Sequence, residues 1–399
     1  MSVRAALAAP LLLVAFVAQA QVPAGPPSTE PAYREGDPFD PVVNLAAPIA
    51  YLIDLGSGRV LFEREPRRRF LPASLTKIMT AYVAFELMAA GRLQPNQRFA
   101  MSDAAFKQWQ RVGSTMFLGR GQVVSVDDLL MGIMTVSAND GCVVLAEGAS
   151  GSVANFVTLM NAEAKRLGMT DSHFGSPNGW PDQGATYTSA RDLGILTRAM
   201  LTRHPAFYRH YVGHSGMAFN GISQSNHVPL FGRVAGADGV KTGFTNESGY
   251  GLVGSAVRDG RRLVMVVGGY DRAWQRARES RALLEWGFSA WQTRRLFAAG
   301  SAVGEARVQG GAARRVPLIA PLAYSVTYPV GSAPPPVKLT LRYEGPIRAP
   351  LAKGAEVATL RIATPGEPPR DLPLLVGSST GTAGPAERLR NGLFELVGL

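Results

Sequence analysis

The chain has 399 residues, 46% of them hydrophobic, which allows two domains with a sizeable core and excludes a disordered protein. Lysine and arginine number 41 against 30 acidic residues, a formal charge of +11 that suits a position against anionic lipid or cell wall. Nucleic acid competes for such a charge, but no helix carries regularly spaced arginines, and we expect no nucleic-acid partner. The single cysteine, Cys142, excludes an intrachain disulfide and is expected in the core.

The first twenty residues predict a secretory signal. They contain one charged side chain, Arg4, then the apolar run AALAAPLLLVAFVA and a small-x-small ending that stops at Ala20. This run is shorter than the roughly 20 residues that span a bilayer, which argues against an uncleaved anchor. We therefore expect export to the periplasm. Residues 21–44 are rich in proline and polar side chains and predict a flexible leader.

Residues 45–292 predict an α+β domain. APIAYLIDL and RVLFERE, on either side of GSG, predict a hairpin, and strands are again expected at GVKTGF, SGYGLVGSAV and RRLVMVVGGY. Asp259 and Gly260 join the last two of these strands and favour a tight turn. Helices are expected between and after the strands, at 73–90, 126–149, 152–167, 189–202 and 272–290. This order predicts an antiparallel sheet with helices packed on its faces.

Residues 295–380 predict a small all-β domain, because short strands alternate with proline and glycine and no helix is expected between them. It contains no titratable cluster, and we interpret it as a spacer or docking module. The tail, 384–399, places Leu389, Leu393, Leu396 and Val397 on one helical face. An amphipathic tail of this kind can contact the inner-membrane surface, and packing on the protein or fraying is the alternative.

A lysine interrupts the apolar helical stretch PASLTKIMTAY, residues 72–82. Ser74 stands three residues before Lys77, so a helix places both side chains on one face. Lys77 could simply extend to solvent. However, the chain contains six lysines and 35 arginines, so a lysine kept in an apolar setting suggests chemistry that needs a neutral amine. A desolvated Lys77 could accept the hydroxyl proton of Ser74 and make it a nucleophile.

Two further stretches supply groups that such a serine needs. TVSANDG places Ser137 and Asn139 at a tight turn or helix start, where a hydroxyl can pass a proton and an amide can orient lysine and substrate. In GVKTGF, Lys241 offers a positive charge for a carboxylate and Thr242 offers a hydroxyl. Gly243 would let a substrate backbone come close. We expect these residues on an edge strand.

The order Ser-x-x-Lys, Ser-x-Asn, Lys-Thr-Gly is typical of penicillin-binding proteins and serine β-lactamases. The chain resembles the low-molecular-mass penicillin-binding proteins, specifically the D-alanyl-D-alanine carboxypeptidases of the bacterial envelope. The resemblance covers nearly the whole catalytic domain and includes IDLGSGRVLFE, PASLTKIMTAYVAFE, VSANDGCVVLAE and DGVKTGFTNESGYGLVGSA. The β domain and the tail are also similar to the layout of that family.

The resemblance implies a β-lactamase/transpeptidase-like fold and an acyl-enzyme. The penultimate D-alanine of a peptidoglycan stem peptide would acylate Ser74 and release the terminal D-alanine. Lys77 would act as base, and Ser137 and Asn139 would relay protons and position the substrate. β-Lactam antibiotics would acylate Ser74 as substrate mimics.

The resemblance also implies substrate-binding roles for Lys241, Thr242, Gly243 and Phe244. Lys241 would hold the terminal carboxylate, and the backbone N–H groups of Ser74 and Phe244 would form the oxyanion hole. Two positions depart from the family. Phe244 stands where histidine is often found, and Ser223 stands where an arginine is common, so carboxylate recognition could differ.

Other functions fit parts of this pattern. A D,D-endopeptidase of wall crosslinks uses the same machinery and is not excluded. A β-lactamase is disfavoured because no Glu-x-x-Leu-Asn segment lies between Asn139 and Lys241, and Glu163 is expected at the surface of a helix. A non-catalytic wall-binding module is disfavoured because the required residues are all present. No histidine follows a nucleophile-elbow motif, and no His-Glu-x-x-His or cysteine cluster predicts a metal, so we expect no cofactor.

Overall fold

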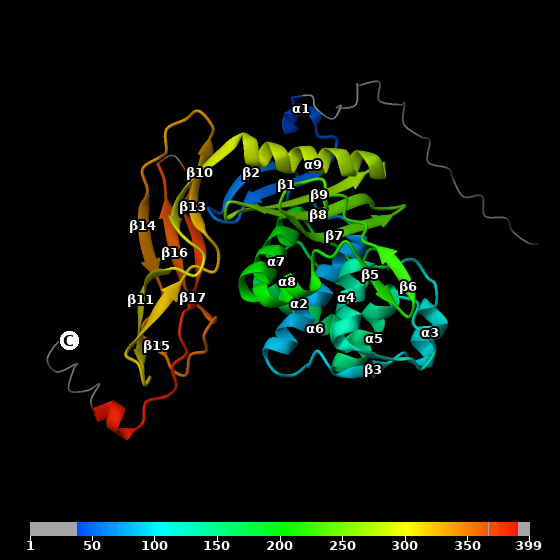
Figure 1. The fold of residues 1–399 in the computed structure, drawn as a ribbon, viewed down its shortest axis with the longest axis horizontal. Helices are drawn as coiled ribbons and strands as arrows, with labels where there is room; N and C mark the ends of the chain where they lie inside the picture. The colour runs from blue at the N-terminus through cyan, green and yellow to red at the C-terminus, as the bar shows by residue number, and fades with distance from the viewer. Residues whose placement is uncertain (1–37, 366, 390–399) are drawn as a thin grey trace, which may run out of the picture.

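A computed structural model describes residues 38–365 and 367–389. The predicted signal, most of the leader and residues 390–399 of the tail lie outside this range. Figure 1 shows a larger body in which helices cover a sheet and a smaller body built from strands. This arrangement confirms the expected fold class.

The larger body is organised around an antiparallel five-stranded sheet in the order β2-β1-β9-β8-β7. Its strands are β1 (Ile49–Asp54), β2 (Arg59–Arg64), β7 (Ala237–Thr245), β8 (Gly249–Arg258) and β9 (Arg261–Tyr270). Both expected hairpins are present, and Asp259 and Gly260 take the positive φ angles of 49° and 75° that a tight turn between β8 and β9 requires. Strand β7, which carries the Lys-Thr-Gly motif, is an edge strand, as predicted.

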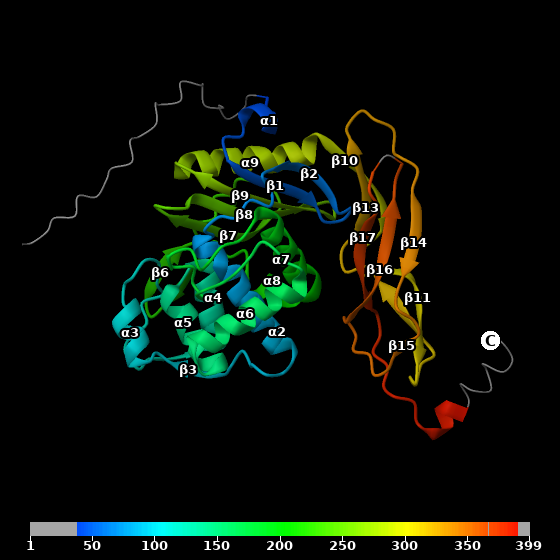
Figure 2. The same ribbon diagram turned by 180° about the vertical axis from the view of Figure 1, so that it is seen from behind.

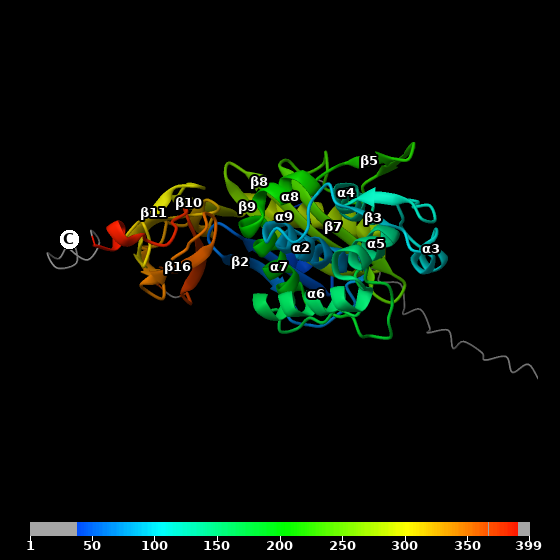
Figure 3. The same cartoon turned by 90° about the horizontal axis from the view of Figure 1, so that it is seen from below.

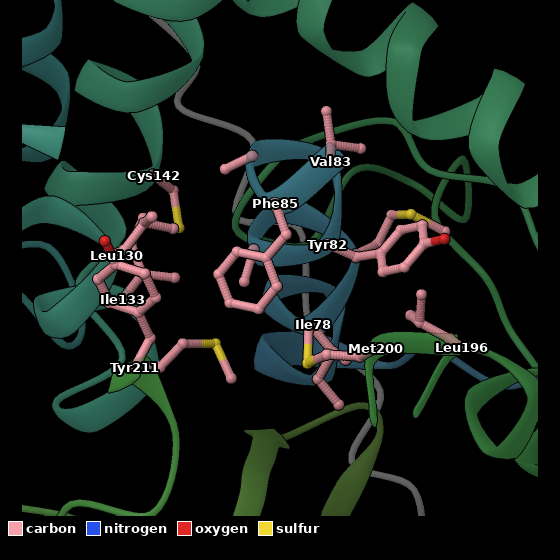
Figure 4. Packing of buried hydrophobic residues seen from close by; sticks show 14 of the residues in the cluster. Ile78, Tyr82, Val83, Phe85, Leu130, Ile133, Cys142, Leu196, Met200 and Tyr211 are labelled. Atoms are coloured by element: carbon pink, nitrogen blue, oxygen red, sulfur yellow. The ribbon is translucent and has the colours of Figure 1, made fainter. Parts of the chain in front are cut away.

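Helices pack on both faces of this sheet. Helix α9 (Ala273–Ser289) covers one face, and the other helices gather on the opposite face (Figures 1 and 2). Those helices are α2 (Lys77–Ala89), α3 (Asp103–Trp109), α4 (Val126–Thr135), α5 (Asn139–Ser150), α6 (Val153–Leu167), α7 (Ala190–Arg203) and α8 (Pro205–Tyr211). Helix α2 runs through the middle of this group, and apolar side chains from several helices surround it (Figure 4).

Two of the predicted helices are interrupted. The helix expected at 73–90 begins as the 3₁₀ turn η1 (Ala73–Thr76) before α2 starts at Lys77. The helix expected at 126–149 is two helices, because Val136–Ala138 leave the helical path and Ser137 has a φ of +64°. The first interruption contains Ser74 and the second contains Ser137, two of the residues that the sequence predicts to be catalytic.

Several short elements were not predicted from the sequence, because each is too brief for a periodic pattern. They are α1 (Pro41–Asn44), α3 and α8, and the strands β3 (Arg98–Ala100), β4 (Val123–Ser125), β5 (Gly216–Phe219) and β6 (Ile222–Ser225). Strands β5 and β6 form a hairpin at the margin of the larger body, remote from the smaller one (Figure 3).

The smaller body consists of strands with a separate apolar core. A six-stranded sheet in the order β14-β16-β17-β12-β11-β15 accompanies the pair β10-β13. These strands are β10 (Trp291–Phe297), β11 (Ala302–Gln309), β12 (Arg315–Ile319), β13 (Tyr324–Pro329), β14 (Lys338–Arg342), β15 (Ile347–Arg348), β16 (Glu356–Ala363) and β17 (Arg370–Val376).

A buried carboxylate joins the two bodies. Asp54, at the end of β1, accepts hydrogen bonds from Arg261 Nε at 2.7 Å and from Thr327 Oγ1 of β13 at 3.0 Å. Asp54 is completely buried, and its oxygens therefore depend on these partners.

Within the described residues, no single helix is long and apolar enough to cross a membrane. The consecutive helices α5 and α6 meet those criteria only as a pair, with a bend of 88° between them.

Candidate active site

Ser74 and Lys77 lie at the start of the central helix, where the sequence leaves no solvent-facing side. From Lys77 to Phe85 every residue of α2 is buried, as expected for a helix that is apolar all round. Lys77 itself is 0% exposed, so the alternative in which its amine extends to solvent is wrong. Ser74, in η1, is only partly buried and can be reached from outside.

The amine of Lys77 contacts three side-chain oxygens. Its Nζ lies 2.7 Å from Ser74 Oγ, 3.1 Å from Ser137 Oγ and 2.6 Å from Asn139 Oδ1. An ammonium group donates to all three. A neutral amine has two N–H donors and a lone pair, so it can donate to Asn139 and Ser137 while it accepts the proton of Ser74. The three predicted motif residues thus meet around one nitrogen.

Burial favours this neutral amine. Desolvation lowers the pKa of Lys77 from its usual 10.5 to about 8, and the nearby Asp140 opposes the shift only in part. A base with a pKa near neutrality combines a usable neutral fraction with proton affinity. The apolar surroundings of Lys77 in this helix therefore lower the pKa of its amine.

Asn139 and Ser137 are held by the break between α4 and α5. The positive φ of Ser137 turns the chain, and the N–H of Asn139 donates to Ser114 O at 2.8 Å. Asn139 Nδ2 donates to Val112 O at 2.9 Å, which leaves Oδ1 free to accept from Lys77. The neighbouring Asp140 carboxylate accepts backbone N–H groups of the same loop. This loop, residues 112–118, is thereby fastened over the site.

Gly243 permits a close contact within the protein, in addition to the predicted approach of a substrate. A Cβ on Gly243 would lie 2.6 Å from Pro72 O and 3.0 Å from Leu75 Cγ. The space that a side chain would fill is therefore occupied by the segment that carries Ser74, rather than kept open on that side for substrate. The absence of a side chain brings the segment with Ser74 close to the edge strand β7.

Lys241 and Thr242 lie on β7 but differ in their access to the site. Thr242 lines the cavity described below, whereas Lys241 is buried and its Nζ donates to Thr242 O at 3.2 Å. Burial lowers the pKa of Lys241 well below its usual value, and the positive charge of Lys77 adds to the effect. A bound anion nearby would restore the charged form of this lysine.

A cavity of about 410 Å³ opens beside Ser74. Besides the predicted residues Ser74, Ser137, Asn139, Thr242, Gly243 and Phe244, its lining includes Trp180, His227, Tyr250 and Arg276. These four were missed, because isolated aromatic and basic residues outside a motif carry no signal in a chain with 35 arginines.

Arg276, on α9, is the most informative of the missed residues. It is buried, its Nε has no hydrogen-bond partner in the described chain, and its guanidinium lies 5.6 Å from the ring of Tyr250. Arginine keeps its charge in proteins, so this is a desolvated cation available to an anion. Ser223, where an arginine is common in the family, lies on β6 and does not line the cavity.

Two further predictions concern residues outside the chemistry. Cys142 is buried in the core, as expected, and desolvation raises its thiol pKa to about 12, so it remains a protonated thiol. Glu163 lies on α6, keeps part of its side chain exposed and pairs with Arg166 on the same helix. It does not line the cavity.

Comparison with known proteins assigns this site to a family. Residues 36–271 match the Peptidase S11 family model, described as D-alanyl-D-alanine carboxypeptidase. The chain belongs to this family. The resemblance inferred from the three motifs is thus confirmed, and the chain is a serine-type D-alanyl-D-alanine carboxypeptidase of the penicillin-binding type. Residues 291–381 match the model described as the C-terminal domain of penicillin-binding protein 5.

Curated relatives of this D-alanyl-D-alanine carboxypeptidase come from several bacteria. The chain is 34% identical to carboxypeptidase DacA of Haemophilus influenzae, over 85% of this chain and 86% of that protein. It is 35% identical to DacC of Escherichia coli, over 82% of each.

Solved structures of related penicillin-binding proteins have a similar fold. Penicillin-binding protein 5 of Haemophilus influenzae superposes with a TM-score of 0.66 at 34% identity, over 84% of this chain and 97% of that one. Penicillin-binding protein D2 of Listeria monocytogenes, solved with ampicillin bound, gives a TM-score of 0.53 at 29% identity, over 61% of this chain and 97% of that one.

Proposed function

We propose that this carboxypeptidase removes the terminal D-alanine of a peptidoglycan pentapeptide by using Ser74 as nucleophile and neutral Lys77 as base. The observation that carries the assignment is the fully buried amine of Lys77, 2.7 Å from Ser74 Oγ. No other described lysine combines burial with contact to a serine hydroxyl at the wall of a cavity.

The reaction follows from these contacts. Lys77 Nζ takes the hydroxyl proton of Ser74 as Oγ attacks the carbonyl carbon of the penultimate D-alanine. The C–N bond then breaks, and the leaving amine takes a proton that Ser137 can relay from Lys77. Water hydrolyses the resulting ester in the second half-reaction. In penicillin, attack opens the β-lactam ring and leaves the same ester.

Two backbone N–H groups are suited to the developing oxyanion. They belong to Ser74 in η1 and Phe244 on the edge strand β7, which the missing side chain of Gly243 brings together. Donors fixed in this way stabilise a negative oxygen without reorganising during the reaction.

The terminal carboxylate of the substrate meets a cationic region. Arg276 and Thr242 line the cavity, and the buried Lys241 precedes Thr242 on β7. Because Arg276 is buried without a partner for its Nε, a carboxylate gains a charge-assisted hydrogen bond there and relieves an unpaired cation. We assign to Arg276 the role that the family resemblance would give to an arginine at position 223.

Ser74→Ala tests this function. The variant should lose both D-alanine release from a pentapeptide and the mass increase that penicillin produces in the wild type. Ser223→Ala, an exposed serine outside the cavity, is the matched control and should keep both. Release of D-alanine by Ser74→Ala at the wild-type rate would refute the acyl-enzyme. A crosslinked peptide dimer, assayed beside the pentapeptide, distinguishes carboxypeptidase from endopeptidase activity.

We propose in addition that the exported protein contacts the inner-membrane surface through residues 384–399. Leu389, near the end of the described chain, is 70% exposed. Residues 385–389 lie on the side of the smaller body away from the sheet and helices of the larger one (Figures 1 and 3). The full chain should therefore sediment with anionic vesicles, and a chain ending at residue 383 should not. Equal sedimentation of the two chains would contradict this contact.

A further inference from the structure

The loop of residues 176–180 lies against the turn η1 that carries the nucleophile. Gly179 has a φ of +73°, and a Cβ on it would lie 1.9 Å from Ala73 O and 2.6 Å from Thr76 Oγ1. Both the backbone angle and the close approach require a glycine at this position. Because Ala73 and Thr76 flank Ser74 in the chain, the loop is placed directly beside the catalytic turn.

Two hydrogen bonds hold this loop in position. Thr80 Oγ1, on α2, donates to Pro177 O at 2.5 Å, and Gly179 N donates to Ser176 Oγ at 3.1 Å. Pro177 and Gly179 are buried, and so is Asn178 between them. The side chain of Asn178 is therefore carried by a fixed segment of the chain.

The amide of Asn178 has one end paired and the other unpaired. Asn178 lines the cavity beside Ser74 and is 1% exposed. Its Oδ1 accepts from the N–H of Trp180 at 3.1 Å, whereas its Nδ2 has no hydrogen-bond partner in the described chain. The reverse orientation of the amide would set two donors against each other, so the contact with Trp180 identifies Nδ2 as the unpaired end.

An unpaired donor in a buried position is costly. Such a group lowers stability by about 1–3 kcal/mol, and in native structures it commonly has a functional reason. Asn139, the other asparagine that lines this cavity, has its Nδ2 committed to Val112 O at 2.9 Å. The Nδ2 donor of Asn178 is thus available to an atom that enters the cavity.

The loop and strand β7 contact different sides of η1. A 3₁₀ helix has three residues per turn, so residues i and i+3 lie on the same side. Strand β7 packs against the side of Pro72 and Leu75, whereas the loop packs against the side of Ala73 and Thr76. Ser74 belongs to the third side. Asn178 therefore approaches the nucleophile from a side that β7 does not occupy.

The groups proposed above for substrate recognition do not include this side. Thr242 and the N–H of Phe244 belong to β7, and Arg276 belongs to α9. Hydrolysis of the ester adds a reactant that these groups do not bind, which is a water molecule. A donor that engages one lone pair of the water oxygen fixes its position and leaves the other lone pair for attack.

We propose that Asn178 Nδ2 holds the water that hydrolyses the acyl-enzyme, a step that rests on the proposed function of Ser74. The water oxygen attacks the carbonyl carbon of the ester while one of its protons passes to neutral Lys77 Nζ. The bond between that carbon and Ser74 Oγ then breaks, and Oγ takes the proton from Lys77. Asn178 donates a hydrogen bond throughout and exchanges no proton.

Decay of the penicillin adduct tests this role, because intact mass follows both formation and loss of the adduct. Asn178→Leu replaces the amide by an apolar side chain of similar size. It should slow decay by about tenfold to a hundredfold and acylation by less than about threefold, because only the second half-reaction uses this water. Asn178→Ala, with a side chain too small to clash, provides the same comparison if the leucine variant does not fold.

A second nucleophile distinguishes loss of water positioning from general damage to the site. Added hydroxylamine attacks the ester without the Asn178 donor and yields a hydroxamate instead of the hydrolysis product. Its rate should be the same in the wild type and in Asn178→Leu. The ratio of hydroxamate to hydrolysis product should therefore rise by the factor by which decay slows.

Ser176→Ala is the matched control within the same loop. Its hydroxyl accepts from Gly179 N, and Ser176 does not line the cavity. The variant loosens the loop but keeps the amide of Asn178, so its adduct should decay at the wild-type rate.

Slow decay in Asn178→Leu, with nearly unchanged acylation and a higher proportion of hydroxamate, supports the proposal. Decay at the wild-type rate overturns it. Equal slowing of acylation and decay also overturns it, since the amide would then bind the acyl group rather than water. Slow decay in Ser176→Ala overturns it as well, because the loop and not the donor would set the rate. Absence of an adduct in the wild type would instead refute the proposed function.

Discussion

At the scale of the residue, the proposed function depends on the amine of Lys77, which is completely buried. Lys77 is surrounded by apolar side chains and retains only three oxygen partners, and desolvation therefore shifts its pKa toward neutrality. In the same helix an arginine would keep its charge at any physiological pH.

The pH dependence of acylation follows from this shift. The neutral form of Lys77 is required, and its pKa is about 8 in the folded protein. The rate constant for acylation by penicillin should therefore increase about tenfold per pH unit below that value and become constant above it. Stopped-flow measurements between roughly pH 6 and pH 9.5 would check this. A flat profile across that range would contradict a titrating base.

Replacement of the base without loss of positive charge is a second test. Lys77→Arg should lower kcat/KM by about a hundredfold or more, because the guanidinium cannot accept the proton of Ser74. The exposed Lys107→Arg is the control and should behave as wild type. An active Lys77→Arg enzyme would require another proton acceptor.

At the scale of the element, the site depends on close contact between η1 and strand β7. Gly243 permits the contact because its Cβ position is 2.6 Å from Pro72 O. The two interrupted helices serve the same end. The turn η1 carries Ser74 and the break between α4 and α5 carries Ser137, and both hydroxyl oxygens lie within 3.1 Å of Lys77 Nζ.

Gly243→Ala should therefore damage both stability and catalysis. We expect a loss of about 1–3 kcal/mol in the free energy of unfolding, as for other overpacked sites. Acylation should slow by about tenfold to a hundredfold as Ser74 is displaced. Urea denaturation and penicillin acylation measure the two effects. Gly119→Ala is the control, since its nearest contact would be an ordinary 3.5 Å. A wild-type rate of acylation in Gly243→Ala would contradict a role of this contact in positioning Ser74.

At the scale of the whole molecule, two separate cores are joined by several polar contacts, which include the Arg59–Glu367 ion pair and the hydrogen bond from Ser325 N to Gly56 O. Asp54 provides the central one, since its carboxylate accepts from Arg261 within the larger body and from Thr327 of the smaller one. No described residue of the smaller body lines the cavity beside Ser74. The contact between the two bodies can therefore be tested separately from the chemistry of the site.

Asp54→Ala should destabilise the protein by about 3–5 kcal/mol, because it leaves Arg261 buried without its counter-charge. Thr327→Val removes the hydroxyl that contacts Asp54 and Ser57 across the two bodies and should cost about 1 kcal/mol. The control, Asp371→Ala, breaks a solvent-exposed pair with Arg361 and should leave the stability nearly unchanged. Calorimetry measures all three. Equal midpoints for Asp54→Ala and Asp371→Ala would contradict a structural role for the junction.

The sequence by itself determined the three motifs, the edge strand that carries Lys-Thr-Gly, the long helices and the division between a mixed fold and a β-rich one. These features depend on local pattern, because apolar periodicity and turn residues act over a few positions. It also predicted the apolar setting of Lys77, since the flanking helix contains no polar face.

Only the tertiary structure decided which residues complete the site. Arg276 and Tyr250 reach the cavity because α9 and the β8 strand pack beside β7, and no local pattern predicts such contacts. The close contact of Gly243 with Pro72 likewise depends on the tertiary structure, because the carbonyl oxygen of Pro72 lies beside the position of the missing Cβ. Distances between segments far apart in the chain are set by packing, and packing is a property of the whole fold.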